Sequence, residues 1–453
     1  MSALLKPRQP SQFELFPEAH QYHDPSQWGW FSLLTRDSLG KTAQTSHRLD
    51  TMPTVLGLVD PHRDTWLSQA EFMRPNRRVV NLLRLGLLFC DIDCYPKKDQ
   101  APELTRWAQG KSPEAMAAAL LHFCHAEGIP PPSVVVYSGR GLQAKWLLEG
   151  TIPRQALPRW NACQRHLVDT LRPYGADPAA KDASRVLRLV DTVNTKSGEL
   201  CRVVHVTCGA DGQPVRYGFE YLAECLLPVA RWQHEANQAK RPKMQLHQGG
   251  KPAGKGLRGF SGRSLAWHRL EDLRTLAQLR GGVAEGQRMQ HLFWQLNFLL
   301  LAGATNTELM WHEAAELARQ IDPSWGYRTP ELSTLYQKAQ AHERGERITF
   351  QGREFAPLYT PKNDTLINLF GITDQEQKQL KTIVSTDEAK ERHAKRDTER
   401  RRAAGAVERA EYLGGAEQRR TAALELRAQG KSWAEVAQAV GYKNAEAARK
   451  SCK

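Results

Sequence analysis

The sequence predicts an α/β (α+β) domain in the first half of the chain, an all-helical domain after it, and a small helix-turn-helix at the C-terminus. Three observations lead to this prediction. Short apolar runs rich in valine and leucine alternate with amphipathic helical segments up to about residue 206. Leucines at helical spacing dominate residues 264–347. The last forty residues contain a capping box and glycine stops between short helices.

Composition limits the class of protein. The chain has 453 residues, a formal net charge of +14 and a pI near 9.4, with 41% apolar and 25% charged residues. This length suits two or three domains, and the positive charge favours a polyanionic partner such as nucleic acid, although a basic surface can also be only a solvated face. No apolar run is long enough to cross a bilayer and the first residues lack a secretory signal, so we expect a cytoplasmic protein with no membrane partner.

Cysteine usage does not favour a zinc site. Eight cysteines occur without a CxxC pair, which is typical of reduced thiols in the cytoplasm. The closest cluster is Cys201, His205 and Cys208. On a strand, Cys208 faces away from the other two residues, so we expect no zinc.

The first half can be divided into elements in order. The opening segment has no clear period, and residues 54–59, 79–83 and 86–90 are predicted strands with arginines between them. Ser112 is a predicted start of a helix over 112–127. Residues 133–137 and 142–148 are predicted to form a hairpin across a glycine turn, and residues 153–171 an amphipathic helix.

Two acids follow the apolar run 86–90. Asp91 and Asp93 are one residue apart, so on a strand both carboxylates point to the same side while Ile92 faces the core. Parallel carboxylates repel each other unless a cation lies between them, and Mg²⁺ or Mn²⁺ is the usual one. The alternative is a strand end that leads into an acidic turn.

Two later stretches supply further polar groups. Residues 138–141 read Ser-Gly-Arg-Gly, a turn whose backbone can approach a ligand closely, and Gln143 and Lys145 follow on one face of the returning strand. Residues 175–198 then combine acids with cations and an amide: Asp177, Asp182, Arg185, Arg188, Asn194 and Lys196. Acids for a metal beside cations for phosphate are what nucleotidyl transfer requires. The alternatives are a plain glycine hairpin and a surface loop in which Arg185 pairs with Asp182.

In this order, the three stretches resemble the archaeo-eukaryotic primase superfamily, and most closely the primases of plasmid and mobile-element replication proteins. The resemblance covers about residues 50–206 and implies a mixed or antiparallel sheet. It implies that Asp91, Asp93 and Asp177 hold divalent ions, with Asp182 pairing an arginine; Asp182 as the third ligand stays an alternative. It also implies a set of nucleotide-binding residues: Ser138, Arg140, Gln143, Arg188, Asn194 and Lys196.

The sequence departs from the family at two places. Gln143 stands where the family commonly has histidine, so it can donate or accept a hydrogen bond but cannot carry a proton at neutral pH. Val190 and Asp191 replace a common Pro-Gly, which puts the shape of that loop in doubt.

The predicted domains are a catalytic domain over 1–235, a basic linker over 236–262, a helical domain over 263–385, a charged helix over 386–412 and the helix-turn-helix over 413–453. Within the linker, residues 249–256 resemble a phosphate loop but lack its Ser or Thr, so no helicase motor is expected. The predicted DNA contacts of the last helices are Lys443, Asn444, Arg449 and Lys450. A three-helix packing module without DNA binding is the alternative.

Together these features predict a plasmid-type replication protein with template-directed primase activity. Its substrates would be nucleoside triphosphates, its cofactor Mg²⁺ or Mn²⁺, and its partners single-stranded template, origin DNA and a separate replicative helicase. A non-catalytic, origin-binding initiator with the same fold is the main alternative, and a metal-dependent nuclease is a third.

Overall fold

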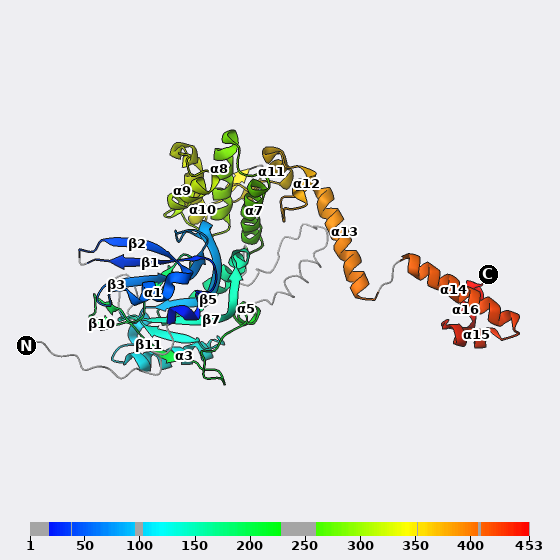
Figure 1. Ribbon diagram of the computed structural model, residues 1–453, viewed down its shortest axis with the longest axis horizontal. Helices are drawn as coiled ribbons and strands as arrows, with labels where there is room; N and C mark the ends of the chain where they lie inside the picture. The colour runs from blue at the N-terminus through cyan, green and yellow to red at the C-terminus, as the bar shows by residue number, and fades with distance from the viewer. Residues whose placement is uncertain are drawn as a thin grey trace, which may run out of the picture. The chain divides into compact units, whose positions relative to one another are not determined.

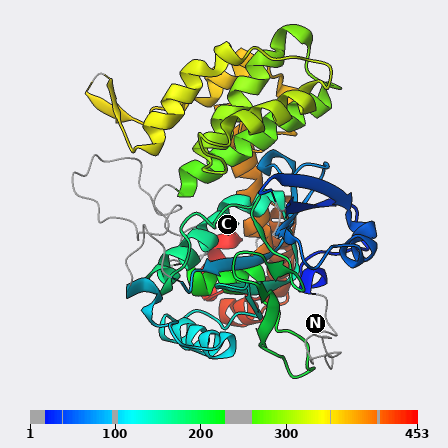
Figure 2. The same cartoon turned by 90° about the vertical axis from the view of Figure 1, so that its left-hand side faces the viewer.

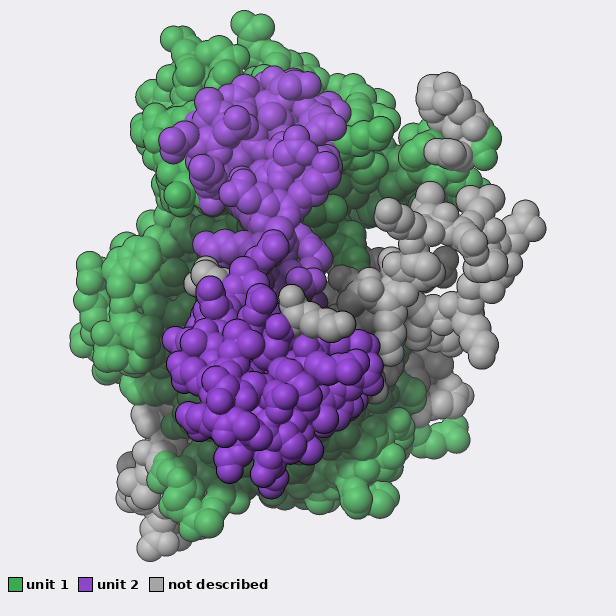
Figure 3. All heavy atoms as spheres, turned by 90° about the vertical axis from the view of Figure 1, so that its right-hand side faces the viewer, with its two compact units in different colours: residues 1–362, 379–382 green, residues 363–378, 383–453 purple. Residues whose placement is uncertain are grey.

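The computed structural model describes residues 18–37, 39–95, 103–227, 260–350, 352–405 and 409–452. The chain forms two compact units: residues 1–362 with 379–382, and residues 363–378 with 383–453 (Figure 3). Of the predicted linker over 236–262, all but the last three residues lie outside the described part, as do residues 249–256. No helix in the described ranges is long and apolar enough to cross a membrane.

The first unit is built on a nine-stranded sheet in the order β11-β6-β7-β5-β4-β1-β3-β8, with β2 paired to β1 (Figure 1). Every pairing in it is antiparallel. The predicted α/β class is therefore confirmed. The strands of the sheet are β1 Trp30–Arg36, β2 Thr42–Arg48, β3 Asp64–Ser68, β4 Ala70–Phe72, β5 Leu82–Ile92, β6 Val134–Tyr137, β7 Leu142–Pro153, β8 Val186–Arg188 and β11 Arg202–Val206.

The sequence-based reading of residues 18–83 needs correction. Residues 54–59 were expected to form a strand, but the chain forms helix α1, Met52–Gly57, which has a proline in its first turn. Residues 79–81 form a 3₁₀ turn, η3, and β5 begins only at Leu82. The antiparallel pair β1 and β2 was not predicted, because β2 is a polar and largely exposed strand without apolar alternation.

Further helices of this part of the unit are α2 Glu103–Arg106, α3 Pro113–Ala126, α4 Leu157–Leu171 and α5 Phe219–Leu226. The predicted helix start at Ser112 is confirmed, since its side chain accepts a hydrogen bond from the Ala115 N–H. Helix α4 has a continuous buried face that includes Trp160, Gln164 and Leu167. A small two-stranded ladder, β9 Val193–Asn194 and β10 Glu199–Leu200, follows β8.

Central strand β5 has one edge that no single strand covers. Its other edge pairs with β7 along most of its length, from Arg84 to Ile92. On the second edge, β4 pairs only with residues 82–85. Beyond that point, side chains of α4 take over: Trp160 Nε1 donates to the Leu87 carbonyl (2.8 Å), and the Gln164 amide both accepts from Phe89 N–H (3.2 Å) and donates to Phe89 carbonyl (2.6 Å). Gln164 thus bonds β5 as a neighbouring strand would.

The helical part of the first unit contains α7 Phe260–Leu279, α8 Arg288–Leu301, α9 Met310–Ile321 and α10 Ser333–Glu343. The leucines predicted as its core are buried, among them Leu270, Leu273, Leu292 and Leu296. A short hairpin, β12 Ile348–Phe350 with β13 Arg353–Phe355, projects from these helices (yellow in Figure 2).

Helix α9 is tied to the sheet domain through Glu313. Its carboxylate accepts hydrogen bonds from Val79 N–H and Val80 N–H in η3 (3.2 Å each). Burial raises the pKa of this carboxyl to about 7, although the two backbone hydrogen bonds oppose that rise. The helical part and the sheet are therefore held together by a buried polar contact as well as by apolar packing.

The second unit is helical, with α11 Asn363–Phe370, α12 Asp374–Gln377, α13 Thr386–Ala403, α14 Arg409–Ala428, α15 Trp433–Val440 and α16 Ala445–Ser451. Helix α13 buries none of its residues, as its charge density predicts. The last three helices pack around Ala423, Val436, Ala437 and Ala448. The predicted capping box forms at Ser432, and the predicted glycine stop is Gly441, which is left-handed (φ 80°). Asn444 caps α16.

Replacing Gln164 with leucine tests its strand-like role. The change keeps a similar volume but leaves the Phe89 N–H and carbonyl buried without partners, so we expect the free energy of unfolding to fall by roughly 2–4 kcal/mol. Urea denaturation of the purified protein measures this. The control is Gln155→Leu, at an exposed position before α4. Equal stability of the two variants would show that α4 does not complete the β5 edge.

Candidate active site

The three predicted acids come together through backbone pairing. Residues 175–177 lie along the open edge of β5: Ile92 bridges to Ala176, the Asp93 N–H donates to the Gly175 carbonyl (2.9 Å), and the Asp177 N–H donates to the Asp91 carbonyl (2.8 Å). Asp93 is buried, and Asp91 and Asp177 are half-buried. Asp177 also accepts from the Ala179 N–H, which fixes the turn that carries it.

The negative charge of this cluster contributes to raised pKa values of the two neighbouring thiols. Burial raises the pKa of Cys90 well above its ordinary value, and the charges of Asp91 and Asp177 add to the rise. Burial also raises the pKa of Cys94 to about 12; a hydrogen bond to Leu142 opposes this, and Asp93 and Asp91 add to it. Both thiols therefore stay protonated at neutral pH, and the carboxylates are the available anionic groups.

The carboxylate oxygens are the donor type that Mg²⁺ and Mn²⁺ prefer. In the described residues, no three His, Cys, Asp or Glu side chains already form a closed metal cage. The backbone thus brings the three aspartates close, and binding of an ion would require their side chains to turn toward it. The residue types fit a divalent cation.

The glycine turn is packed directly against the strand that carries the acids. A side chain on Gly141 would place its Cβ 2.4 Å from the Ile92 carbonyl oxygen, which only glycine avoids. The turn is closed by Ser138, whose N–H donates to the Gly141 carbonyl (2.8 Å). Arg140 stacks over the Tyr95 ring at 3.7 Å, so its charge is held just beyond Asp93.

The third stretch is attached to that turn by Asn194. Its side-chain amide donates to the Ser138 carbonyl (2.9 Å), and Gly139 has a φ of 88° with Asn194 filling the space a side chain would need. Lys196 is exposed two residues later, and its N–H donates to the Asn194 side chain. The Ser138–Gly139 part of the turn, Asn194 and the backbone of Lys196 therefore form one connected group.

Arg188 has a different environment from the one expected. It is buried and forms an ion pair with Asp64 of β3 (2.5 Å), and its guanidinium lies 4.7 Å from the centre of the Trp66 ring. Asp64 also accepts from the N–H and hydroxyl of Thr195. Asp64 thus holds the segment between Asn194 and Lys196 in place. The sequence offered no signal for it, since it is a single acid in a short strand.

The structure also shows the surroundings of the predicted ion pair and of the loop that departs from the family. Arg185 pairs with Asp182 (2.9 Å), as the ion-pair alternative proposed, and Asp177 is the acid beside the Asp-x-Asp strand. Asp191, which stands where the family commonly has glycine, adopts a left-handed φ of 67°. Aspartate adopts the left-handed conformation more readily than most residues. The loop therefore has a left-handed residue at this position although the glycine is absent.

Gln143 lies opposite Asp91 in the β5–β7 register. Its side chain is 3% exposed, and its Oε1 has no hydrogen-bond partner among the described residues. Lys145, two residues on, is buried in an ion pair with Glu18 near the Tyr22 hydroxyl. The site therefore contains a buried acceptor without a hydrogen-bond partner among the described residues, opposite Asp91, while the nearby lysine is already neutralised.

Comparison with known proteins gives one curated relative. No protein-family model matches the chain. Its sequence is 28% identical over 314 residues to a replication protein of Clostridium perfringens. The chain is related to a bacterial replication protein. The match covers 69% of this chain and 66% of that protein, so the chain spans slightly less than two thirds of the relative's length. This relative confirms the resemblance to replication proteins that the sequence predicted.

Three solved structures also align with the chain. The archaeo-eukaryotic primase domain of the cyanophage S-2L primase-polymerase covers 44% of this chain and 90% of its own length, with 15% identity and a TM-score of 0.31. The catalytic domain of primase RepB′, in complex with initiator DNA, covers 49% and 96%, with 17% identity and a TM-score of 0.29. A second RepB′ structure covers 72% and 96%, with 15% identity and a TM-score of 0.28.

Asp64→Asn tests whether the Arg188 ion pair holds the third stretch. Burial raises the pKa of the Asp64 carboxyl, but hydrogen bonds from Thr195 and Arg188 outweigh it and leave the pKa below its ordinary 3.8. Ionised Asp64 therefore stabilises the fold at neutral pH, and this stabilisation is lost as the pH falls through the lowered pKa. We expect a loss of about 3 kcal/mol at pH 7 that shrinks near pH 3, measured by urea denaturation.

The matched control is Asp50→Asn, which breaks an exposed pair with Arg48. Such a pair contributes less than about 1 kcal/mol. If Asp64→Asn cost no more than this control at pH 7, the buried pair would not stabilise the site.

Proposed function

We propose that this chain is a plasmid-type replication protein with template-directed primase activity, joining nucleotides at Asp91, Asp93 and Asp177. The observation that carries the proposal is the backbone pairing of residues 175–177 with residues 91–93, beside a glycine turn fastened by Asn194. In this proposal the three acids would hold the metal, and the turn, with the cations Arg140 and Lys196, would hold the phosphates. The relationship to a replication protein supports it.

The proposed chemistry is nucleotidyl transfer. Asp91, Asp93 and Asp177 would hold Mg²⁺ or Mn²⁺, which would supply positive charge to activate the primer 3′-hydroxyl and to stabilise the leaving pyrophosphate. The acids themselves bind metal and transfer no proton. The Ser138–Gly141 turn, Arg140 and the exposed Lys196 would hold the triphosphate. The Gln143 side chain is buried, so its oxygen would accept a hydrogen bond from a nucleotide hydroxyl only after the side chain turned toward the ligand.

In this proposal Arg188 acts through other residues. The Arg188 guanidinium is already bound by Asp64 and lies over the Trp66 ring. Its proposed role is therefore to hold Asp64, which positions the Asn194–Lys196 segment, and not to contact the triphosphate directly. Asp182 is likewise a structural residue that pairs with Arg185.

The rival proposal is a non-catalytic initiator that keeps the fold and binds origin DNA. Gln143 favours it, because glutamine cannot replace a histidine that carries a proton. A nuclease using the same acids is less well supported, because the Arg140 and Lys196 cations beside the turn suit a triphosphate. The proposed partners are single-stranded template, origin DNA and a separate helicase.

Asp91→Asn/Asp93→Asn should abolish dinucleotide synthesis on a single-stranded template with Mg²⁺ or Mn²⁺, lowering the rate by at least ~100-fold, because amides bind divalent cations far more weakly than carboxylates. Labelled ribo- and deoxynucleotides as substrates would show which primer is made. The control is Asp387→Asn, an exposed acid of α13 whose change should leave the rate intact.

The outcomes separate the three proposals. Wild-type protein that makes no dinucleotide but still binds origin DNA would support the initiator. Strand cutting that needs no added nucleotides and is lost in the aspartate variant would support the nuclease.

The C-terminal helices would deliver this activity to DNA. Lys443 is exposed in the turn between α15 and α16, and Arg449 and Lys450 are exposed near the end of α16. Lys450 forms an exposed ion pair with Glu446. Asn444 caps α16 through the Ala447 N–H, so its oxygen serves the helix. A short second helix after a glycine turn is the arrangement that enters a major groove.

The triple change Lys443→Ala/Arg449→Ala/Lys450→Ala should weaken duplex DNA binding by roughly 10–100-fold and reduce the salt slope of the affinity, because up to three phosphate contacts are removed. Fluorescence anisotropy at several salt concentrations measures both. The core residues are untouched, so the melting temperature should not change. Lys390→Ala, an exposed lysine of α13, is the control, and an equal loss in both variants would contradict the proposal.

A further inference from the structure

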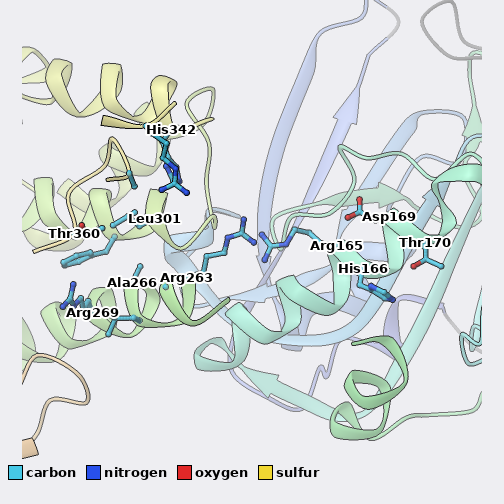
Figure 4. A pocket seen from close by; sticks show the side chains of 15 residues that line it. Arg165, His166, Asp169, Thr170, Arg263, Ala266, Arg269, Leu301, His342 and Thr360 are labelled. Atoms are coloured by element: carbon cyan, nitrogen blue, oxygen red, sulfur yellow. The ribbon is translucent and has the colours of Figure 1, made fainter. Parts of the chain in front are cut away.

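A cavity of about 930 Å³ lies between α4 and the helices α7, α8 and α10 (Figure 4). It contains none of the residues of the candidate active site. Basic side chains from several elements line it: Arg165, His166, Arg263, Arg269, His342 and Arg347. Among the described residues that line it, Asp169 is the one acid. The cavity is therefore strongly cationic.

Two of these arginines converge from opposite walls. Arg165 of α4 and Arg263 of α7 extend toward one another (Figure 4). Both guanidinium groups approach Gly303, each with a nitrogen 3.6 Å from the position of a Cβ there. In the described part of the chain, neither forms an ion pair with an acid. Like charges that face each other in a cavity attract an anion that can bridge them.

The protonation equilibria agree with this geometry. Burial and, to a smaller extent, the charge of Arg263 lower the pKa of Arg165 to about 10, and Asp169 partly opposes this. Burial also lowers the pKa of Arg263. The pKa of His342 is lowered first by burial and then by Arg263 and Arg347. The charged forms of these groups are thus destabilised in the empty cavity, and a bound anion would relieve that cost.

The uncharged part of the wall is mainly apolar, with Thr170 and Thr360 as its polar side chains. Leu265 is exposed and Leu301 is half-buried, whereas Phe298 is fully buried, with its ring 5.8 Å from the Arg269 guanidinium. A cationic end combined with an apolar wall fits a ligand that has both a polyphosphate and a flat aromatic group. An inorganic anion would use only part of the cavity.

We propose that this cavity is a second nucleotide site, which binds a nucleoside 5′-triphosphate with its phosphates between Arg165 and Arg263 and its base against the apolar surface of Leu265 and Leu301. The ligand is either a free nucleotide or the 5′-triphosphate end of an oligonucleotide, since both present the same chemistry. The site does not depend on the proposed primase reaction. It is nevertheless close in sequence to Asp177, because α4 ends at Leu171, whose carbonyl accepts from the Ala176 N–H (3.3 Å).

The test uses the full-length Asp91→Asn/Asp93→Asn protein in EDTA, so that metal-dependent binding at the aspartates cannot contribute. Binding of a fluorescent ATP analogue is measured by anisotropy. Arg165→Gln/Arg263→Gln in this background should weaken binding by at least ~10-fold, because two charge-assisted contacts are lost. Arg328→Gln, an exposed arginine outside the cavity, is the matched control and should change the affinity less than ~2-fold.

A stability measurement separates lost binding from misfolding. Removing Arg165 and Arg263 removes two facing like charges, so the melting temperature without ligand should equal or exceed that of the parent. Saturating ATP should raise the melting temperature of the parent and not that of the double variant. A double variant that binds ATP as tightly as its parent would overturn the proposal.

Competition identifies the source of the triphosphate. Unlabelled ATP and an oligonucleotide with a 5′-triphosphate are compared with inorganic tripolyphosphate and the same oligonucleotide with a 5′-hydroxyl. The proposal is supported if ATP, the 5′-triphosphate oligonucleotide or both displace the probe, while tripolyphosphate and the 5′-hydroxyl oligonucleotide compete at least ~10-fold more weakly. The stronger competitor then identifies the ligand. If the 5′-hydroxyl oligonucleotide displaced the probe as strongly as ATP does, the cavity would be a contact for the nucleic-acid backbone. If tripolyphosphate displaced it as strongly as ATP does, the cavity would be a general anion site. Both results contradict the proposal.

Discussion

The second edge of β5 is the constraint on which the rest of the site depends. A buried strand must have partners for its N–H and carbonyl groups on both sides. Strand β4 supplies them at the start, Trp160 and Gln164 of α4 supply them in the middle, and residues 175–177 supply them at the end. The order of these partners along β5 follows their order along α4 and the turn after it. The position of Asp177 next to Asp91 is therefore a result of how the strand is completed.

The remaining polar groups are joined to this edge in a chain of contacts. Gly141 lies against Ile92, Asn194 holds Ser138, and Asp64 holds Thr195. Each contact is made by backbone or by a short side chain, which leaves little freedom of position. Negative charge is thus concentrated at the strand end, whereas Arg140 and Lys196 lie on the turn and the loop around it. A separation of this kind is what a substrate with both a hydroxyl to activate and phosphates to hold requires.

The sequence predicted features that depend on local chemistry. The helix starts at Ser112 and Ser432, the glycine turn, the side shared by Asp91 and Asp93 and the pairing of Arg185 with Asp182 all follow from neighbours within a few residues. It did not predict the partners of Arg188 and Phe89, because Asp64 and Gln164 lie 124 and 75 residues away in the chain. Residues 54–59 were misread because a valine- and leucine-containing run is compatible with a strand or a short helix, and Pro53 favoured the helix.

The use of Gln164 in place of a strand also bears on how the protein folds. Strands β5, β6 and β7 can form from local hairpin pairing and one longer connection, and they bring Asp91 and Gln143 together. Asp177 joins them only after α4 has docked, because the segment that carries it follows directly from that helix. A nascent chain that ends before α4 contains strands β1 to β7 and two of the three acids, but it lacks β8, β11 and Asp177. Assembly of the carboxylate site is therefore coupled to a late, long-range step.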